Sequence, residues 1–132
     1  MKRLLLIAAA LAALTTASIA NRLAVPVIVG GERDYDACGS SGTVEGLNPH
    51  GDGFLAVKAG PGLNFERIDK LYNGMQVYIC GEQGDWFAIV YSQTGSWSER
   101  CNVSTPWPRA MPYTGPCRSG WVHRRWVGSL AG

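Results

Sequence analysis

Four cysteines are the residues of this chain best suited to covalent or metal chemistry. They are Cys38, Cys80, Cys101 and Cys117. Zinc sites usually draw on closely spaced cysteines or histidines, such as two cysteines separated by two residues. No such pair occurs, and the two histidines, His50 and His123, lie far apart in the sequence. We therefore expect disulfides and no metal site, because an even number of cysteines is typical of an exported, disulfide-bonded chain.

Three pairings of the four cysteines are possible. We predict Cys101–Cys117, because the segment between them is rich in proline, serine, glycine and arginine and shows no periodicity of its own. Cys38–Cys80 then follows partly by elimination. In the chain-entropy model, the shorter closure stabilises the fold by about 3 kcal/mol and the longer one by about 4 kcal/mol.

Motifs for catalysis are missing from the sequence. Neither the serine elbow “G-x-S-x-G” nor the zinc-protease motif “H-E-x-x-H” occurs. A cysteine–histidine pair would need a free thiol, which two disulfides do not leave. We interpret Asp69, Glu82 and Asp85 as solvated loop carboxylates, and His123 as a surface residue beside two arginines. The sequence therefore predicts a protein that is not an enzyme and carries no cofactor.

The segment “NPHGDGFLAVKA” matches part of a calcium-binding EF-hand loop. Asn48, His50 and Asp52 occupy ligand positions 1, 3 and 5, and Gly53 fits position 6. Position 12, which needs a glutamate with two ligand oxygens, is Ala59. Only one carboxylate remains, so we interpret the segment as a turn that leads into a strand.

Aromatic residues and arginines gather toward the end of the chain. Aromatic platforms edged by polar groups bind sugar rings and extended peptides. The predicted ligand-binding residues are Trp97, Trp107, Tyr113, Trp126, Arg109, Arg124 and Arg125. The alternative is that these aromatic side chains only cap the protein core, in which case replacing them would lower stability rather than affinity.

Charge is distributed unevenly along the sequence. Residues 21–99 contain five basic and ten acidic residues, whereas residues 100–132 contain five arginines and no acid. These charges sum to zero, which argues against bulk binding of nucleic acid, whose affinity comes largely from phosphate neutralisation. The basic end could contact an anionic polymer, although arginines that pair with the chain's own acids are the simpler interpretation.

The N-terminal residues have the three-part layout of a secretory signal peptide. Two basic residues precede an apolar run at residues 4–14, and Ser18 and Ala20 fit a cleavage site after Ala20. The apolar run is shorter than the roughly 20 residues that a membrane span needs. We therefore predict a signal peptide over residues 1–20 and a periplasmic or secreted mature protein without a stable membrane anchor.

Short apolar runs separated by glycine and proline predict many short strands. Residues 63–74 are expected to form a single helical turn inside a long loop, and residues 21–41 an N-terminal arm. The expected strands lie at residues 43–47, 54–59, 75–80, 86–92 and 120–127, with a candidate edge strand at residues 25–29.

Four motifs follow one another in a specific order: “AVKAGP”, “LYNGMQV”, a strand that begins with Trp86, and “GWV”. In this order and spacing the sequence resembles the bacterial SH3 domain family over residues 53–127. The resemblance implies an all-β fold, a small SH3-like barrel of five to six short strands over residues 42–132. Residues 93–119 replace the short hairpin of the family with a long inserted loop.

The strand at residues 86–91 is apolar on both faces. If Ile89 faces the barrel core, the face with Val90 needs a second cover, which we expect from the inserted loop with Trp107 and Pro108. The predicted barrel core consists of Leu55, Val57, Ile68, Leu71, Val77, Ile79, Phe87, Ile89 and Val122.

The resemblance also implies a function. Bacterial SH3 domains suggest binding to cell-wall peptidoglycan or to an envelope protein, here at the surface where the inserted loop meets the barrel. The alternative is an inhibitor or immunity protein for a cell-wall hydrolase. A pre-organised loop would reduce the entropy cost of binding.

Overall fold

The computed structural model describes residues 22–51 and 53–130, and the predicted signal peptide lies outside these residues. The fold is all-β, with two antiparallel sheets and two short 3-10 helices, η1 and η2. Within the described residues, no helix is long and apolar enough to cross a membrane. The elements are β1 (Ile28–Val29), β2 (Ser40–Val44), β3 (Leu55–Lys58), β4 (Arg67–Leu71), β5 (Gln76–Gln83), β6 (Trp86–Tyr91), η1 (Glu99–Cys101), β7 (Met111–Pro112), β8 (Arg118–His123), η2 (Arg124–Trp126) and β9 (Val127–Leu130).

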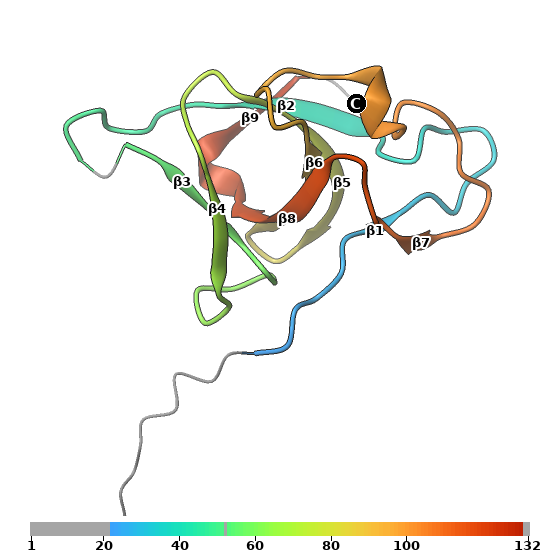
Figure 1. The fold of residues 1–132 in the computed structure, drawn as a ribbon, viewed down its shortest axis with the longest axis horizontal. Helices are drawn as coiled ribbons and strands as arrows, with labels where there is room; N and C mark the ends of the chain where they lie inside the picture. Colours follow the sequence, from blue (N-terminus) through green and yellow to red (C-terminus); the bar gives the residue numbers. More distant parts are fainter. Residues whose placement is uncertain (1–21, 52, 131–132) are drawn as a thin grey trace, which may run out of the picture.

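Seven strands form the larger sheet in the order β4-β3-β8-β6-β5-β2-β9, and β1 pairs with β7 in the smaller one. Figure 1 shows the larger sheet curled around a common interior. The curl follows from the connection of β8 to β9, because η2 redirects the chain from the middle of the sheet to its edge beside β2. Strands on opposite sides of the interior then face each other.

Most strands lie close to their predicted positions, and the structure differs from the prediction in three places. The expected helical turn at residues 63–74 is wrong, because the segment contains strand β4. Ile68, placed in the predicted core, is 49% exposed on this strand. The predicted strand at residues 120–127 ends at His123, where the imidazole caps η2 by accepting a hydrogen bond from the backbone N–H of Arg125.

Buried apolar side chains form two separate clusters. The first, which we call the sheet core, comprises Val44, Leu47, Leu55, Val57, Leu71, Val77, Ile79, Ile89, Tyr91, Val122 and Val127, with Phe87 only partly buried against it. The second, which we call the loop core, comprises Val27, Val29, Ala37, Cys38, Tyr78, Ala88, Val90, Cys101, Val103, Tyr113 and Trp121.

Strand β6 separates the two cores. Ile89 and Tyr91 point into the sheet core, whereas Ala88 and Val90 point into the loop core. The expected cover over the second face is therefore confirmed. Trp107 packs against the loop core from the inserted loop, although Pro108 remains exposed.

Both predicted disulfides, Cys38–Cys80 and Cys101–Cys117, are present. Together they tie the N-terminal arm to β5 and close most of the inserted loop. Two structural disulfides indicate an oxidising compartment outside the cytoplasm.

Candidate ligand-binding site

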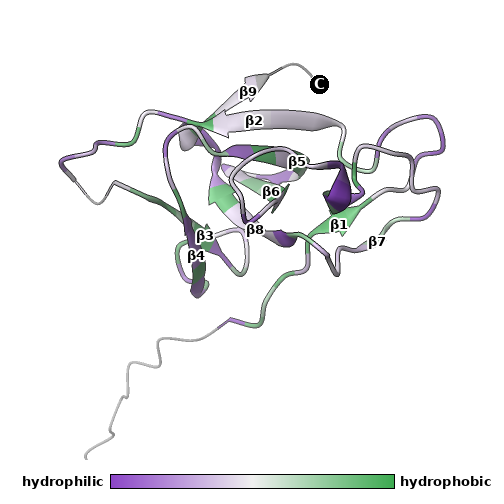
Figure 2. Ribbon diagram, turned by 45° about the horizontal axis from the view of Figure 1, so that its top comes forward, coloured by the Kyte–Doolittle hydropathy of each residue, from purple (hydrophilic) through white to green (hydrophobic). Residues whose placement is uncertain are grey.

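The inserted loop occupies residues 92–117 in the structure. It begins after Tyr91 and returns at Arg118, which pairs with Tyr91 across the β6–β8 ladder. The N-terminal arm holds it from one side, since the backbone N–H groups of Ala37 and Cys38 donate to Thr105 and Val103 over 2.8 and 3.1 Å. Figure 2 colours β1 of the arm as hydrophobic and the turn of η1 in the inserted loop as hydrophilic.

Tyr113 ties the two ends of the Cys101–Cys117 disulfide together. Its hydroxyl donates to the backbone carbonyl of Cys101 over 2.8 Å and accepts from the backbone N–H of Cys117 over 3.0 Å. Burial raises the pKa of the Tyr113 hydroxyl, so the group stays protonated and able to donate. The side chain is only 7% exposed. Tyr113 therefore positions the loop from beneath.

Trp107 lies above Tyr113 and is partly exposed. The two rings stack with centroids 6.3 Å apart, and the indole N–H of Trp107 donates to the carbonyl of Asn102 over 2.8 Å. The arm approaches closely at Gly30, where a Cβ would lie 2.6 Å from Trp107 Cβ and the backbone φ is +81°. Only glycine fits this position, so the arm lies directly against the backbone and Cβ of Trp107.

A hollow opens beside the Trp107 ring. Its volume is about 470 Å³, and we call it the Trp107 hollow. Its walls are mostly apolar and combine Trp107, two prolines and a methionine with Arg109. The lining residues are Asn102, Thr105, Pro106, Trp107, Pro108, Arg109 and Met111. An aromatic and apolar lining that includes one arginine suits a ring or an aliphatic group that carries a nearby anionic or polar substituent.

The five arginines of the acid-free end differ in their partners. Arg118 pairs with Asp69 over 3.1 Å, Arg124 pairs with Glu82, and Arg125 lies 4.9 Å over the ring of Trp126. Arg100 and Arg109 make no ion pair with any residue in the described ranges. The expectation that these arginines pair internally therefore holds for Arg118 and Arg124, and the unpaired Arg109 lines the Trp107 hollow.

The seven predicted ligand-binding residues do not form one surface. Trp107 and Arg109 line the Trp107 hollow, with Tyr113 beneath it. Trp97 packs on β5, where its indole N–H donates to the carbonyl of Val77 over 3.1 Å. The other three, Arg124, Arg125 and Trp126, form η2, which follows the end of the β6–β8 ladder opposite the inserted loop. Figure 1 shows the loop on the right of the sheet and η2 toward the left.

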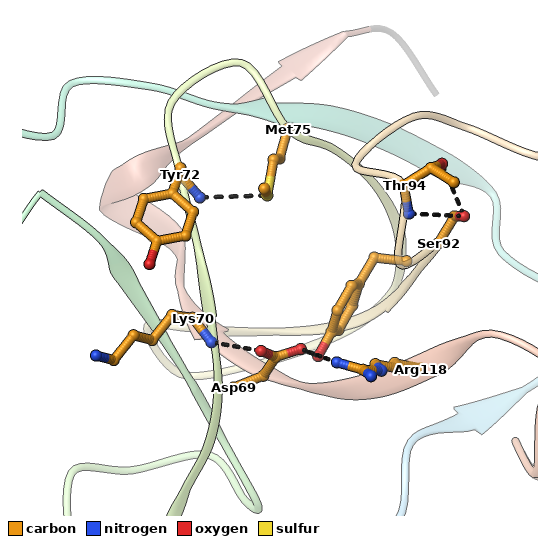
Figure 3. Close-up of polar contacts among 8 residues, drawn as sticks. Asp69, Lys70, Tyr72, Met75, Ser92, Thr94 and Arg118 are labelled. Carbon is orange, nitrogen blue, oxygen red and sulfur yellow. Dashed lines mark hydrogen bonds and ion pairs between the residues drawn. The ribbon is translucent and has the colours of Figure 1, made fainter.

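Asp69 is not a solvated loop carboxylate, which corrects the interpretation from the sequence. Strand β4 turns it inward, where its Oδ2 accepts hydrogen bonds from the Tyr91 hydroxyl over 2.8 Å and from Arg118 over 3.1 Å. Its Oδ1 accepts from the backbone N–H of Lys70 over 2.8 Å. Figure 3 shows this cluster, with Ser92 and Thr94 on the neighbouring turn.

Electrostatics keep this cluster in one protonation state. Partial burial would raise the pKa of Asp69, but hydrogen bonds from Tyr91, Lys70 and Arg118 outweigh it and hold the pKa below its usual range. Burial and the neighbouring carboxylate raise the pKa of Tyr91. Asp69 is thus an ionised anchor that joins β4 to β6 and β8 at the foot of the inserted loop.

His123 is partly exposed beside Arg124 and Arg125, as predicted, and it also makes structural contacts. Its ring meets the ring of Trp86 edge-on at 5.5 Å, and its Nδ1 accepts the capping hydrogen bond of η2. In the part of the chain that the structure describes, no three histidine, cysteine or carboxylate side chains are grouped so that they could hold a metal ion.

Comparison with known proteins gives no relative: no protein-family model, curated protein or solved structure matches this chain. The conclusions about its site therefore depend on its own geometry.

Proposed function

We propose that this chain is an exported, non-catalytic binding module that recognises peptidoglycan through the Trp107 hollow. We further propose that the curled seven-stranded sheet is an SH3-like barrel of the bacterial type, with residues 1–20 removed on export to the periplasm or the medium. The order of the sequence motifs and the antiparallel curl of the sheet support the family proposal.

One observation carries the function: the inserted loop brings a tryptophan and an arginine without an ion pair among the described residues into the lining of one hollow. The Cys101–Cys117 disulfide and the two hydrogen bonds of the Tyr113 hydroxyl fix the loop before any ligand arrives. Such pre-organisation lowers the entropy cost of binding. An indole face suits a sugar ring, and a guanidinium suits a carboxylate, and peptidoglycan carries both groups side by side.

Binding to purified peptidoglycan sacculi tests this proposal. Wild-type protein should sediment with sacculi, and Trp107→Ala should weaken binding by about tenfold, as expected for a central aromatic contact. Arg109→Gln should weaken binding to sacculi by several-fold, because the variant loses the cation that would pair with a carboxylate. The Arg109 side chain is exposed, so its replacement should leave the fold intact. Arg33→Gln, an exposed arginine on the arm, is the matched control and should bind as the wild type does.

Two results would contradict the proposal. A larger loss in Trp126→Ala than in Trp107→Ala would move the site to η2. Failure of the wild-type protein to sediment, with one envelope protein co-purifying from the native host, would favour the inhibitor or immunity role. Thermal melts of each variant separate lost affinity from lost folding.

A further inference from the structure

A second hollow is lined by Arg100 of η1 and by residues from both ends of the inserted loop. Its volume is about 500 Å³, and we call it the Arg100 hollow. The lining residues are Ser92, Gln93, Thr94, Ser98, Arg100, Pro116 and Cys117. None of them is acidic, and the nearby Asp69 is already neutralised by Arg118. Arg100, which has no ion pair among the described side chains, is therefore the one charged residue of the lining, and the neighbouring Glu99 does not line the hollow.

The hydroxyl groups in the Arg100 hollow have protons to donate. Ser98 Oγ accepts a hydrogen bond from the backbone N–H of Arg100 over 3.2 Å, and no residue in the described ranges accepts the Ser98 hydroxyl proton. Ser92 Oγ and Thr94 Oγ1 lie 3.0 Å apart, so one hydroxyl donates to the other and one proton stays available. A guanidinium beside hydroxyl donors is a set of groups that complements a carboxylate.

The walls of the Arg100 hollow are fixed by contacts that do not involve its free donors. The carbonyl of Ser98 accepts from the Tyr78 hydroxyl over 3.0 Å and from the backbone N–H of Cys101 over 3.0 Å. The backbone N–H of Cys117 is held by the Tyr113 hydroxyl. Ser98 and Cys117 therefore keep their positions whether or not a ligand is present.

We propose that the Arg100 hollow is a carboxylate subsite, in which Arg100 pairs with the anion and the hydroxyls of residues 92, 94 and 98 donate to it. A single cation matches the single charge of a carboxylate. This inference rests on the proposed function for the source of the ligand, which is the free carboxylate of a peptidoglycan stem peptide.

The two hollows are placed to bind one polymer. Arg100 lines one and Asn102 the other, and their Cα atoms are two residues apart, which is about 7 Å at most. A glycan ring on Trp107 and a peptide carboxylate on Arg100 could then come from one polymer. The disulfide at Cys101 holds the residue between Arg100 and Asn102 in place.

Nuclear magnetic resonance titration tests the subsite without sacculi. Isotope-labelled mature protein is titrated with N-acetyl-D-alanyl-D-alanine, with the C-terminal amide of the same dipeptide, and with glucuronic acid. The dipeptide acid should shift the resonances of the Ser98 amide and of the Arg100 Nε–H, and its amide should not. Glucuronic acid distinguishes a sugar carboxylate from a peptide carboxylate, and stronger binding of the sugar acid would overturn the assignment to the stem peptide.

Variants of Arg100 make the test specific. Arg100→Gln should weaken dipeptide binding by about tenfold, because hydrogen bonds to a charged group are lost. The affinity of Arg100→Lys for the dipeptide should lie between those of the wild type and Arg100→Gln, since lysine keeps the charge but lacks the planar, two-pronged guanidinium. Arg33→Gln is again the control. The Arg100 side chain is exposed, so the folded spectrum should persist in each variant.

The outcomes separate this inference from the proposed function. If sacculi bind but the dipeptide does not, or Arg100→Gln changes nothing, the subsite is wrong and the wall-binding function stands. If the dipeptide binds through Arg100 but sacculi do not, the carboxylate subsite stands and peptidoglycan as its source is wrong. If neither binds, both proposals are wrong.

Discussion

The sheet core and the loop core lie back to back on β6, and they are built by different means. The sheet core consists almost entirely of aliphatic side chains from strands, and it contains no cysteine. The loop core draws on the arm, the inserted loop and the outer face of the sheet, and all four cysteines belong to it or pack against it. Cross-links are therefore concentrated where regular strand pairing is short.

The backbone explains this difference. Strands satisfy their N–H and C=O groups in the ladder, so the sheet core needs only apolar area. The inserted loop has one short pairing with β1, and its remaining polar groups need other partners. Three indole N–H groups hold the loop and the arm in place by donating hydrogen bonds to backbone carbonyls. Trp97 of the loop donates to β5, Trp107 donates within the loop, and Trp121 of β8 donates to the arm. Tryptophans that look like a binding platform in the sequence therefore also hold the loop in place.

The largest expected effect comes from an isoleucine in the sheet core. Ile89→Ala should lower the free energy of unfolding by about 2–5 kcal/mol, because Ile89 is fully buried and the change leaves a cavity. Ile68→Ala is the matched control. Ile68 is 49% exposed, so this change should lower the free energy of unfolding by well under half as much as Ile89→Ala does. Urea denaturation measures both, and equal losses would show that Ile68 belongs to the core.

Removal of the loop disulfide should have the next largest effect. The double variant Cys101→Ser and Cys117→Ser should lose about 3 kcal/mol in the chain-entropy model. Amide hydrogen exchange should accelerate in residues 92–117 while β5 and β6 stay protected. Uniform acceleration of exchange across both regions would show that the two cores unfold as one unit. The sheet core and the loop core would then differ in the residues that build them but not in stability.

A smaller effect is expected for the Tyr113 hydroxyl. Tyr113→Phe leaves the carbonyl of Cys101 and the backbone N–H of Cys117 without their partner, so stability should fall by about 1–3 kcal/mol. Sacculus binding should fall as well, because Cys117 lines the Arg100 hollow and the Tyr113 ring stacks on Trp107 of the Trp107 hollow. Tyr35→Phe, at a tyrosine that is 67% exposed, is the control for loss of a hydroxyl. Weaker binding at unchanged melting temperature would instead make Tyr113 a direct ligand contact.

Alternating apolar residues made much of the sheet predictable from the sequence. Leu55 and Val57 alternate as expected, and the two-sided apolar pattern of β6 correctly indicated a second cover. Strand β4 could not be predicted, because its inward positions hold Asp69 and Leu71 while Ile68 faces out. An inward aspartate needs side-chain partners, and those of Asp69 are Tyr91 and Arg118, which are distant in the sequence.

The candidate site was predictable only in part. Trp107 and Arg109 are close in sequence, so their meeting at one hollow follows from the loop itself. The distance between η2 and the inserted loop depends on the length of the β6–β8 ladder, which loop composition does not encode. Serine and threonine in a loop are ordinary residues, and only the acid-free stretch of sequence that begins at Arg100 pointed toward the Arg100 hollow.

The smallest expected effect concerns the charge at Asp69, which joins the edge of the sheet to the foot of the inserted loop. Its folded pKa lies below the unfolded value, so the ionised form contributes stability that is fully present above the unfolded pKa of about 3.9. That stability is lost as the pH falls through the folded pKa. The Arg118 side chain is 51% exposed, and the pair should therefore contribute about 1 kcal/mol or less.

Asp69→Asn tests this contribution through its pH dependence. The variant should be slightly less stable than the wild type at pH 7, and the difference should shrink as the pH falls below about 4, because protonation then removes the same charge from the wild type. Asp85→Asn is the control, since Asp85 is exposed and its carboxylate makes no ion pair with any described residue. Melting temperatures across this range measure the effect. A difference that stays constant down to pH 2 would show that hydrogen-bond geometry, and not the charge of Asp69, holds β4 against β6 and β8.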